Sequence, residues 1–136
     1  MRFSGLLSLQ LLSIVFVFSL TISCSSSENS NYQIENCNIE KIKFDLTDID
    51  NRGLIGELDN KVALDFEFCI PNKPEIIKEV LAINASLKTQ KSKGRSNCNE
   101  QSILVIGNTY NKDFKKLLCK ISQLEYVKEI NQTYWE

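Results

Sequence analysis

Residues 62–70 alternate in polarity, and this pattern constrains the fold more than any other feature of the chain. One face of an extended segment would carry Val62, Leu64, Phe66, Phe68 and Ile70, and the other would carry Ala63, Asp65, Glu67 and Cys69. A period of two predicts a β-strand with one buried and one wetter face, as antiparallel sheets allow. We therefore expect a central strand here, with Asp65 and Glu67 on its solvated side.

Two amphipathic helices are predicted after this strand. Asn72 is the candidate N-cap of the first, with Pro74 in its first turn and Glu75 three residues after the cap, so we expect a helix over residues 73–84. Asn111 is the candidate cap of the second helix. Its apolar stripe comprises Phe114, Leu117, Leu118, Ile121 and Leu124.

Three more strands complete the predicted sheet: a lysine-rich segment over residues 87–93, the apolar run over 103–106, and a last segment over 126–135. The order β-α-β-β-α-β predicts an α+β, ferredoxin-like split βαβ fold, in which an antiparallel sheet carries two helices on one face. The lysine-rich strand falls at an edge, where lysine discourages further pairing. We also expect an N-terminal strand pair, Ile39–Leu46 and Leu54–Leu58, turning through residues 50–53.

The first 23 residues have the composition of an export signal. Arg2 is their one charged residue, and an apolar run follows from Leu6 to Leu20. About 15 residues at ~1.5 Å rise cover about 22 Å, which is less than a hydrocarbon core of ~30 Å. The segment is therefore interpreted as a secretory signal peptide, and an N-terminal transmembrane anchor is the alternative.

The end of this segment, Thr21-Ile22-Ser23-Cys24, resembles the lipobox of bacterial lipoproteins. In that family a small residue precedes the cysteine that receives the lipid and becomes the new N-terminus. The family prefers leucine three positions before the cysteine; here Thr21 occupies that place, and Leu20 lies one position earlier. The resemblance covers residues 1–24 and implies fatty acylation, such as palmitate, on Cys24.

This interpretation divides the chain into a signal peptide (1–23), a polar tether (24–36) and a single α+β domain (37–136). Several acyl chains would anchor the protein to a membrane without a spanning helix. Ser25 resembles the residue that directs lipoproteins to the outer membrane in diderm bacteria. We expect a location in the cell envelope, with the periplasmic and surface orientations both open.

Cysteine counting agrees with lipidation, because five cysteines in an exported chain leave one unpaired. If Cys24 carries lipid, the other four can form two disulfides in an oxidising envelope. Cys69 ends the first strand and Cys98 precedes the third, which is its antiparallel neighbour, so these two are expected to pair. Cys119 then pairs with Cys37.

Composition excludes several functions. The chain has no histidine, which removes imidazole metal ligands, the commonest general base and every Ser-His or Cys-His nucleophile pair. With 16 basic and 17 acidic residues it also lacks the positive charge of a nucleic-acid binder. A short basic run, Lys88, Lys91, Lys93 and Arg95, is best explained as a solvated edge and loop because no aromatic side chains accompany it.

Two acidic patterns are candidate sites. Residues Asp48–Asp59 match a calcium loop at positions 1, 3, 6 and 8, but Arg52 occupies position 5, Asp59 replaces the bidentate glutamate, and no helices flank the loop. We therefore predict a hairpin turn here, and calcium binding is the alternative. Asp65 and Glu67 resemble an acid/base pair, but neighbouring outward positions on a strand are normally solvated.

The expected function is that of a membrane-anchored, non-enzymatic lipoprotein without cofactor or metal, whose domain binds an envelope protein. An inhibitor or immunity-type role fits this size and anchoring by analogy. One alternative is a carboxylate-dependent envelope hydrolase that uses two of Asp65, Glu67, Asp113 and Glu129. The other is a purely structural lipoprotein.

Overall fold

The structure is a computed structural model, and it describes residues 37–134. The signal peptide, Cys24 and the tether lie outside these residues, as do the last two residues. In the described part the fold is α+β, with two α-helices and two antiparallel sheets. Among the described helices, none combines the length and apolar character needed to span a bilayer.

The larger sheet contains four strands in the order β4-β5-β3-β6, and each neighbouring pair is antiparallel. Its strands are β3 (Asp65–Pro71), β4 (Lys88–Gln90), β5 (Ser102–Asn108) and β6 (Asn131–Gln132). The long strands β3 and β5 pair over their whole length, from Asp65↔Asn108 to Pro71↔Ser102. The lysine-rich strand β4 lies at one edge, as predicted.

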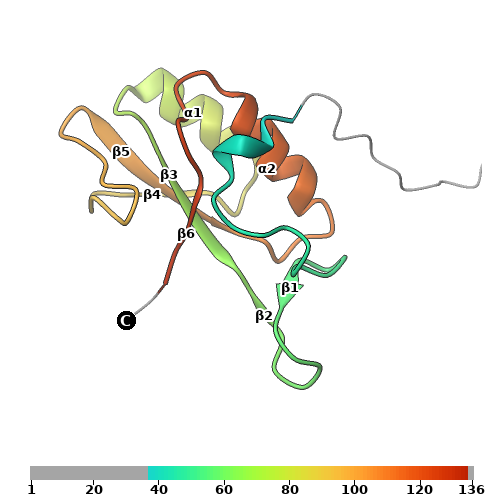
Figure 1. Cartoon of the computed structure of the whole chain (residues 1–136). Helices are drawn as coiled ribbons and strands as arrows, with labels where there is room; N and C mark the ends of the chain where they lie inside the picture. Colours follow the sequence, from blue (N-terminus) through green and yellow to red (C-terminus); the bar gives the residue numbers. More distant parts are fainter. Residues whose placement is uncertain (1–36, 135–136) are drawn as a thin grey trace, which may run out of the picture. The chain divides into compact units, whose positions relative to one another are not determined.

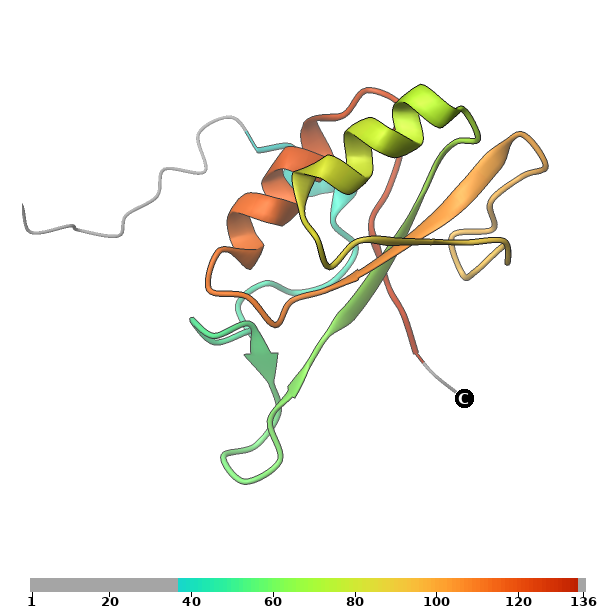
Figure 2. The same ribbon diagram turned by 180° about the vertical axis from the view of Figure 1, so that it is seen from behind.

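Both helices, α1 (Pro74–Ile83) and α2 (Phe114–Gln123), cover the same face of this sheet (Figures 1 and 2). The apolar side chains of β3 predicted to be buried point into this layer, and Phe66 and Phe68 have no exposed surface. The helices contribute Val80, Phe114, Leu117, Leu118 and Ile121 to the same core. Burial of aromatic and aliphatic side chains on one face of each element therefore positions the sheet.

Gly107 on β5 permits this close packing. A Cβ atom at this position would lie 2.6 Å from Cζ of Phe66 and 2.7 Å from Cδ2 of Leu87. The absence of a side chain lets the phenyl ring lie against the neighbouring strand.

The predicted N-terminal strand pair is wrong. Residues Ile39–Lys41 form a short 3₁₀-helix, η1, and strand β1 (Leu54–Ile55) pairs with β2 (Val62–Ala63) instead. Hairpin pairing is favoured because a turn of six residues joins β1 to β2, and the amide of Asn60 donates to the carbonyl of Glu57 within it. The segment after η1 bonds to Ile130, not to β1.

Other element boundaries also differ from the prediction; for example, the N-cap of α2 is Asp113 and not Asn111. The alternating segment is split at Leu64, because β2 pairs with β1 and β3 pairs with β5 and β6. Helix α1 begins after an extended Lys73, and Asn72 makes no capping hydrogen bond. The last strand is two residues long, since the chain before it contacts the segment after η1.

Candidate functional site

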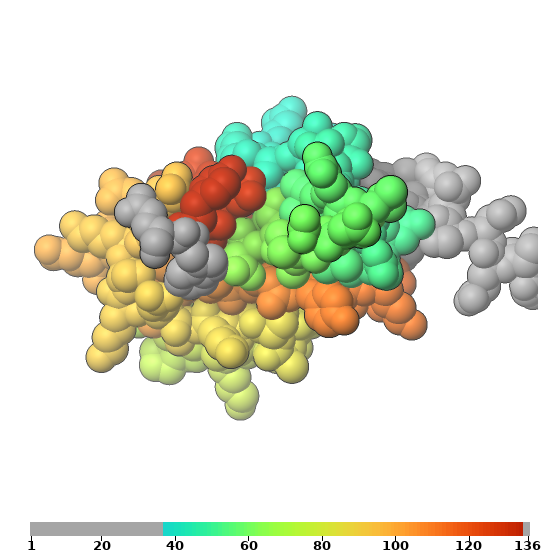
Figure 3. All heavy atoms as spheres, turned by 90° about the horizontal axis from the view of Figure 1, so that it is seen from below, coloured from blue at the N-terminus to red at the C-terminus, as the bar shows by residue number. Residues whose placement is uncertain are grey.

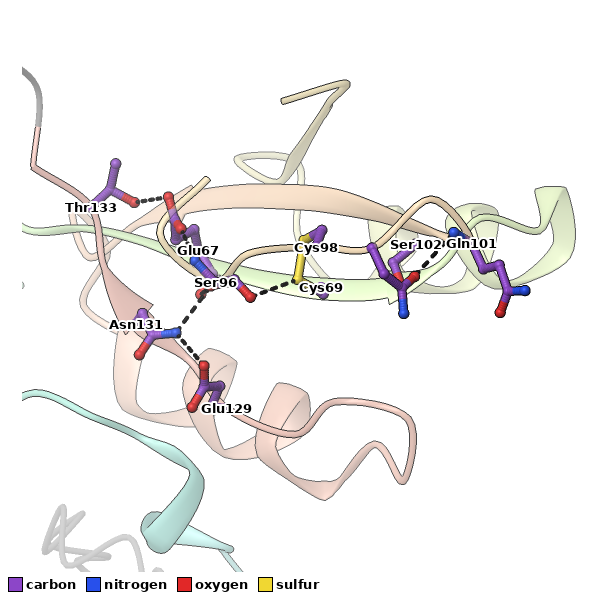
Figure 4. The surroundings of a disulfide bond; sticks show 10 residues. Glu67, Cys69, Ser96, Cys98, Gln101, Ser102, Glu129, Asn131 and Thr133 are labelled. Carbon is purple, nitrogen blue, oxygen red and sulfur yellow. Dashed lines mark hydrogen bonds between the residues drawn. A yellow bond between two sulfur atoms is a disulfide. The ribbon is translucent and has the colours of Figure 1, made fainter. Parts of the chain in front are cut away.

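The face of the sheet away from the helices is covered in part by the segment between β4 and β5, residues 91–101, which we call the disulfide loop. Cys69 on β3 and Cys98 in this loop are joined by a disulfide, with the Cα atoms 5.5 Å apart (Figure 4). This is the pair expected from strand order. Figure 3 views the domain from this side, and the yellow loop lies beside the red C-terminal segment.

Glu67 lies beneath the disulfide loop and is 2% exposed, so the expectation of a solvated carboxylate is wrong for this residue. The amide of Ser96 donates to Oε1 of Glu67 at 2.7 Å, and the hydroxyl of Thr133 donates to Oε2 at 3.1 Å. A buried carboxylate needs such donors, because its desolvation is otherwise costly. Glu67 therefore anchors the loop and the C-terminal segment to the sheet.

A short polar network continues from this carboxylate to the surface. The side-chain amide of Asn131 donates to the hydroxyl of Ser96 and to Oε1 of Glu129, each at 3.0 Å (Figure 4). Nearby, the guanidinium of Arg95 lies 4.7 Å from the centre of the Tyr134 ring. The loop is thus held by a covalent bond, a charge-assisted hydrogen bond to Glu67, a neutral hydrogen bond from Asn131 and a cation–π contact.

Gly94 allows the disulfide loop to approach Glu67. Its φ is +59°, and a Cβ atom would lie 2.6 Å from Oε1 of Glu67 and 2.7 Å from Cδ2 of Leu104. Both the backbone conformation and the close contact favour glycine. The sequence pattern alone predicted a solvated Glu67. The available signal for its burial was the presence of Gly94 and Cys98 in one loop, because a loop bonded to Cys69 lies close to Glu67.

We expect Gly94→Ala to lower the free energy of unfolding by about 1–3 kcal/mol, because the methyl group must displace the carboxylate or the loop. Urea denaturation of the oxidised protein measures this change. Ser92→Ala, at an exposed position of the same loop, is the matched control. Equal stability of Gly94→Ala and the wild type would show that the loop does not rest on Glu67.

A cleft of about 590 Å³, which we call the disulfide cleft, borders the disulfide. Its lining comprises Cys69, Ile70, Pro71, Ser96, Asn97, Cys98, Asn99, Ser102, Tyr126, Lys128 and Glu129. The hydroxyl of Tyr126 is buried and has no hydrogen-bond partner among the described residues. Burial raises the pKa of Tyr126, and the nearby carboxylate of Glu79 raises this pKa further.

A second hollow, of about 460 Å³, lies over the part of the sheet that the disulfide loop leaves uncovered, and we call it the β4–β5 hollow. Asp65, Ser86, Lys88, Thr89, Gln90, Ile106, Gly107 and Asn108 line it. The four residues of the basic run are exposed, in line with the prediction of a solvated edge and loop.

The carboxylates considered for catalysis lie in different places. Asp65 borders the β4–β5 hollow, Glu129 borders the disulfide cleft, and Glu67 is enclosed between sheet and loop. Asp113 precedes α2 at the surface and pairs with Lys116 at 3.6 Å. Among the described residues, therefore, neither the disulfide cleft nor the β4–β5 hollow is lined by two of these four carboxylates.

The calcium-like segment forms a hairpin held by Asp50. The backbone amides of Arg52 and Leu54 donate to Oδ1 of Asp50 at 2.8 and 3.0 Å, and Lys61 contacts Oδ2 at 2.9 Å. Lys61 therefore holds the pKa of Asp50 well below its ordinary range, and the backbone donors lower it further. Within residues 37–134, no cluster of three or more acidic or cysteine side chains could hold a metal ion.

The depressed pKa of Asp50 predicts a pH dependence. Its stabilising contribution is present above the ordinary aspartate pKa of about 4 and is lost as the pH falls toward the lower folded-state value. We expect Asp50→Asn to lower the melting temperature at pH 7 and to lower it less at pH 3. Thermal unfolding at both pH values measures this, with Asp59→Asn of the same hairpin as the control; an equal decrease at both would contradict it.

Cys37 and Cys119, expected to form the second disulfide, are free thiols in the structure. They are nevertheless neighbours: Sγ of Cys37 lies 3.5 Å from the hydroxyl of Ser122, which donates to the carbonyl of Cys119 at 2.8 Å. Burial and the adjacent Cys37 thiol raise the pKa of Cys119 to about 12. The structure therefore brings the two cysteines together without a bond, and their pairing stays a prediction.

Comparison of the chain with models of protein families, with curated proteins and with solved structures finds no match.

Proposed function

We propose that this protein is a lipid-anchored protein of a bacterial cell envelope whose domain binds a protein partner and catalyses no reaction. The lipobox-like residues Thr21–Cys24 support the anchor, through lipid on Cys24. The Cys69–Cys98 disulfide supports export, because such bonds persist in oxidising compartments. The resemblance at Ser25 supports the outer membrane of a diderm bacterium as the location.

We also propose that the larger sheet and its helices form a ferredoxin-like split βαβ arrangement. The order β4-β5-β3-β6, the antiparallel pairing and the placement of both helices on one face support this assignment (Figures 1 and 2). In this arrangement the second face is open unless another element covers it.

The observation that carries the partner-binding proposal is the partial cover of that second face. The disulfide loop encloses Glu67 and Leu104, whereas Asp65, Ile106 and Asn108 remain half-buried beside an exposed edge strand. An uncovered part of a sheet with an adjacent cleft is a surface on which another protein can dock. The enclosed position of Glu67 supports a structural role for this carboxylate, since 2% exposure keeps it from a substrate.

In-cell photocrosslinking tests this function on the full chain. A photoreactive residue replaces Gln90 in the β4–β5 hollow, Lys128 at the disulfide cleft, or Lys78 on α1 as the control. We expect a discrete crosslinked envelope protein from Gln90 or Lys128 and none from Lys78. The proposal fails if all three positions give the same products or none gives any, an outcome that would favour a purely structural lipoprotein.

A further inference from the structure

Strand β3 has one edge that is paired over only part of its length. Strand β6 pairs with it at Phe66 and Glu67, whereas β5 pairs with all seven of its residues. The chain that leads into β6 bonds elsewhere: the amide of Ile130 donates to the carbonyl of Lys41 at 2.7 Å, and the amide of Lys43 donates to the carbonyl of Ile130 at 2.9 Å. Figure 1 shows this red segment crossing β3 obliquely.

The direction of the backbone groups follows from the antiparallel ladder. The amide of Thr109 donates to the carbonyl of Leu64, and that of Asn72 donates to the carbonyl of Gln101, so even-numbered residues of β3 direct their backbone groups toward β5. The groups of odd-numbered residues point to the other edge. Beyond Glu67 these are the groups of Cys69 and Pro71, at the disulfide cleft.

Pro71 offers no amide, and its carbonyl accepts a hydrogen bond from the amide of Lys73 at 2.8 Å. Cys69 therefore contributes both an N–H and a C=O to this edge. Within residues 37–134, no backbone hydrogen bond joins Cys69 to Tyr126, Lys128 or Glu129, which also line the cleft. An amide and a carbonyl on one strand edge are the groups that an added strand recognises.

The charges on the cleft indicate what kind of peptide fits. Lys128 and Glu129 carry opposite charges, and the other lining residues are uncharged. The volume of about 590 Å³ is within the range of binding sites for small ligands and short segments. The charges of Lys128 and Glu129 sum to zero, so the cleft has no net charge that a ligand must neutralise. An uncharged extended segment is therefore complementary to it.

We propose that the disulfide cleft binds an extended, uncharged peptide segment of a partner, which pairs with the backbone of Cys69 as an added strand. This inference rests on the proposed partner-binding function and names its contact site. The disulfide forms part of the site, since it holds residues 96–99 against the end of β3 (Figure 4).

The test uses the ¹⁵N-labelled full chain in detergent micelles and amide hydrogen exchange followed by NMR. In the free protein we expect the Cys69 amide to exchange at least about tenfold faster than those of Phe68 and Ile70, which both point toward β5. The probe is a capped Thr-Val-Thr-Val-Thr-Val hexapeptide at millimolar concentration. It should slow exchange at Cys69 by about tenfold or more.

A fully N-methylated hexapeptide controls for backbone pairing, because it lacks the amide donors. It should give no protection, and Lys128→Trp, which fills the cleft, should abolish protection by the parent peptide; Lys78→Trp on α1 should not. A folded-state NMR spectrum verifies each variant. Equal protection by both peptides, full protection of Cys69 in the free protein, or no protection by the parent peptide would overturn the inference.

The hydrogen-exchange experiment tests the contact site, and in-cell crosslinking tests the partner-binding function, so the two claims can be refuted separately. A partner crosslinked through Gln90 alone, with no peptide bound at Cys69, would preserve the proposed function and refute the site. Peptide binding at Cys69 without any crosslinked partner would refute the function as stated.

Discussion

Replacing Cys69 with serine is expected to lower the free energy of unfolding by about 3–4 kcal/mol. The disulfide joins residues 29 positions apart. In the chain-entropy model, closing a loop of that length lowers the entropy of the unfolded chain and raises its free energy by this amount. Single domains are stable by about 5–15 kcal/mol, so the loss is a large share of the total. Urea denaturation of the exported, oxidised protein measures it.

The variants Cys98→Ser and Cys69→Ser/Cys98→Ser should lose the same amount as Cys69→Ser, because all three remove one bond. A reductant should bring the wild type to their stability. Trypsin should then cut faster at Lys91, Lys93 and Arg95, since the disulfide loop has lost its covalent bond to β3. A wild type whose stability does not change on reduction would contradict the role of this bridge.

The second large effect concerns Cys37 and Cys119, which we propose form a disulfide in the exported protein. The hydroxyl of Ser122 lies between the Cys37 thiol and the Cys119 carbonyl, so the two cysteines are already adjacent. A disulfide oxidant would accept two electrons and two protons from these thiols, forming one S–S bond and two thiols of its own. Closing a loop of roughly 80 residues would add about 4–5 kcal/mol.

The raised pKa of Cys119, about 12, implies that this thiol ionises little at neutral pH. Reaction through Cys119 with glutathione disulfide should therefore be slow at pH 7 and accelerate as the pH rises, because the thiolate is the nucleophile. Peptide mapping without reduction should find Cys37 linked to Cys119, and Cys37→Ser should remove the gain in stability. A Cys37–Cys69 peptide, or free Cys37 and Cys119 in exported protein, would refute the pairing.

The elements that could be predicted from sequence are those whose own periodicity determines burial. The alternation around Phe66 and Phe68 and the stripe of α2 need one buried face each, so their type and approximate extent follow from local pattern. The disulfide partner of Cys69 followed from strand order in the same way, because Cys98 precedes the antiparallel neighbour of β3.

The bounds and partners of the short elements could not all be predicted, because distant contacts determine them. Ile130 pairs with the segment after η1, some 90 positions away in the sequence, and this contact keeps β6 from beginning before Asn131. The burial of Glu67 also depends on a distant loop. The expected disulfide placed that loop two residues from Glu67, so the pairing already implied that one face of β3 was covered there.

The most direct test of the central claim, a lipid anchor on an envelope domain, is metabolic labelling with a palmitate analogue followed by mass spectrometry of the mature chain. Wild type and Cys37→Ser should incorporate the label and sediment with membranes, with lipid on an N-terminal Cys24. Cys24→Ser should incorporate no label and leave the membrane fraction. An unmodified Cys24 in the wild type, or a mature chain that begins at another residue, would contradict the account.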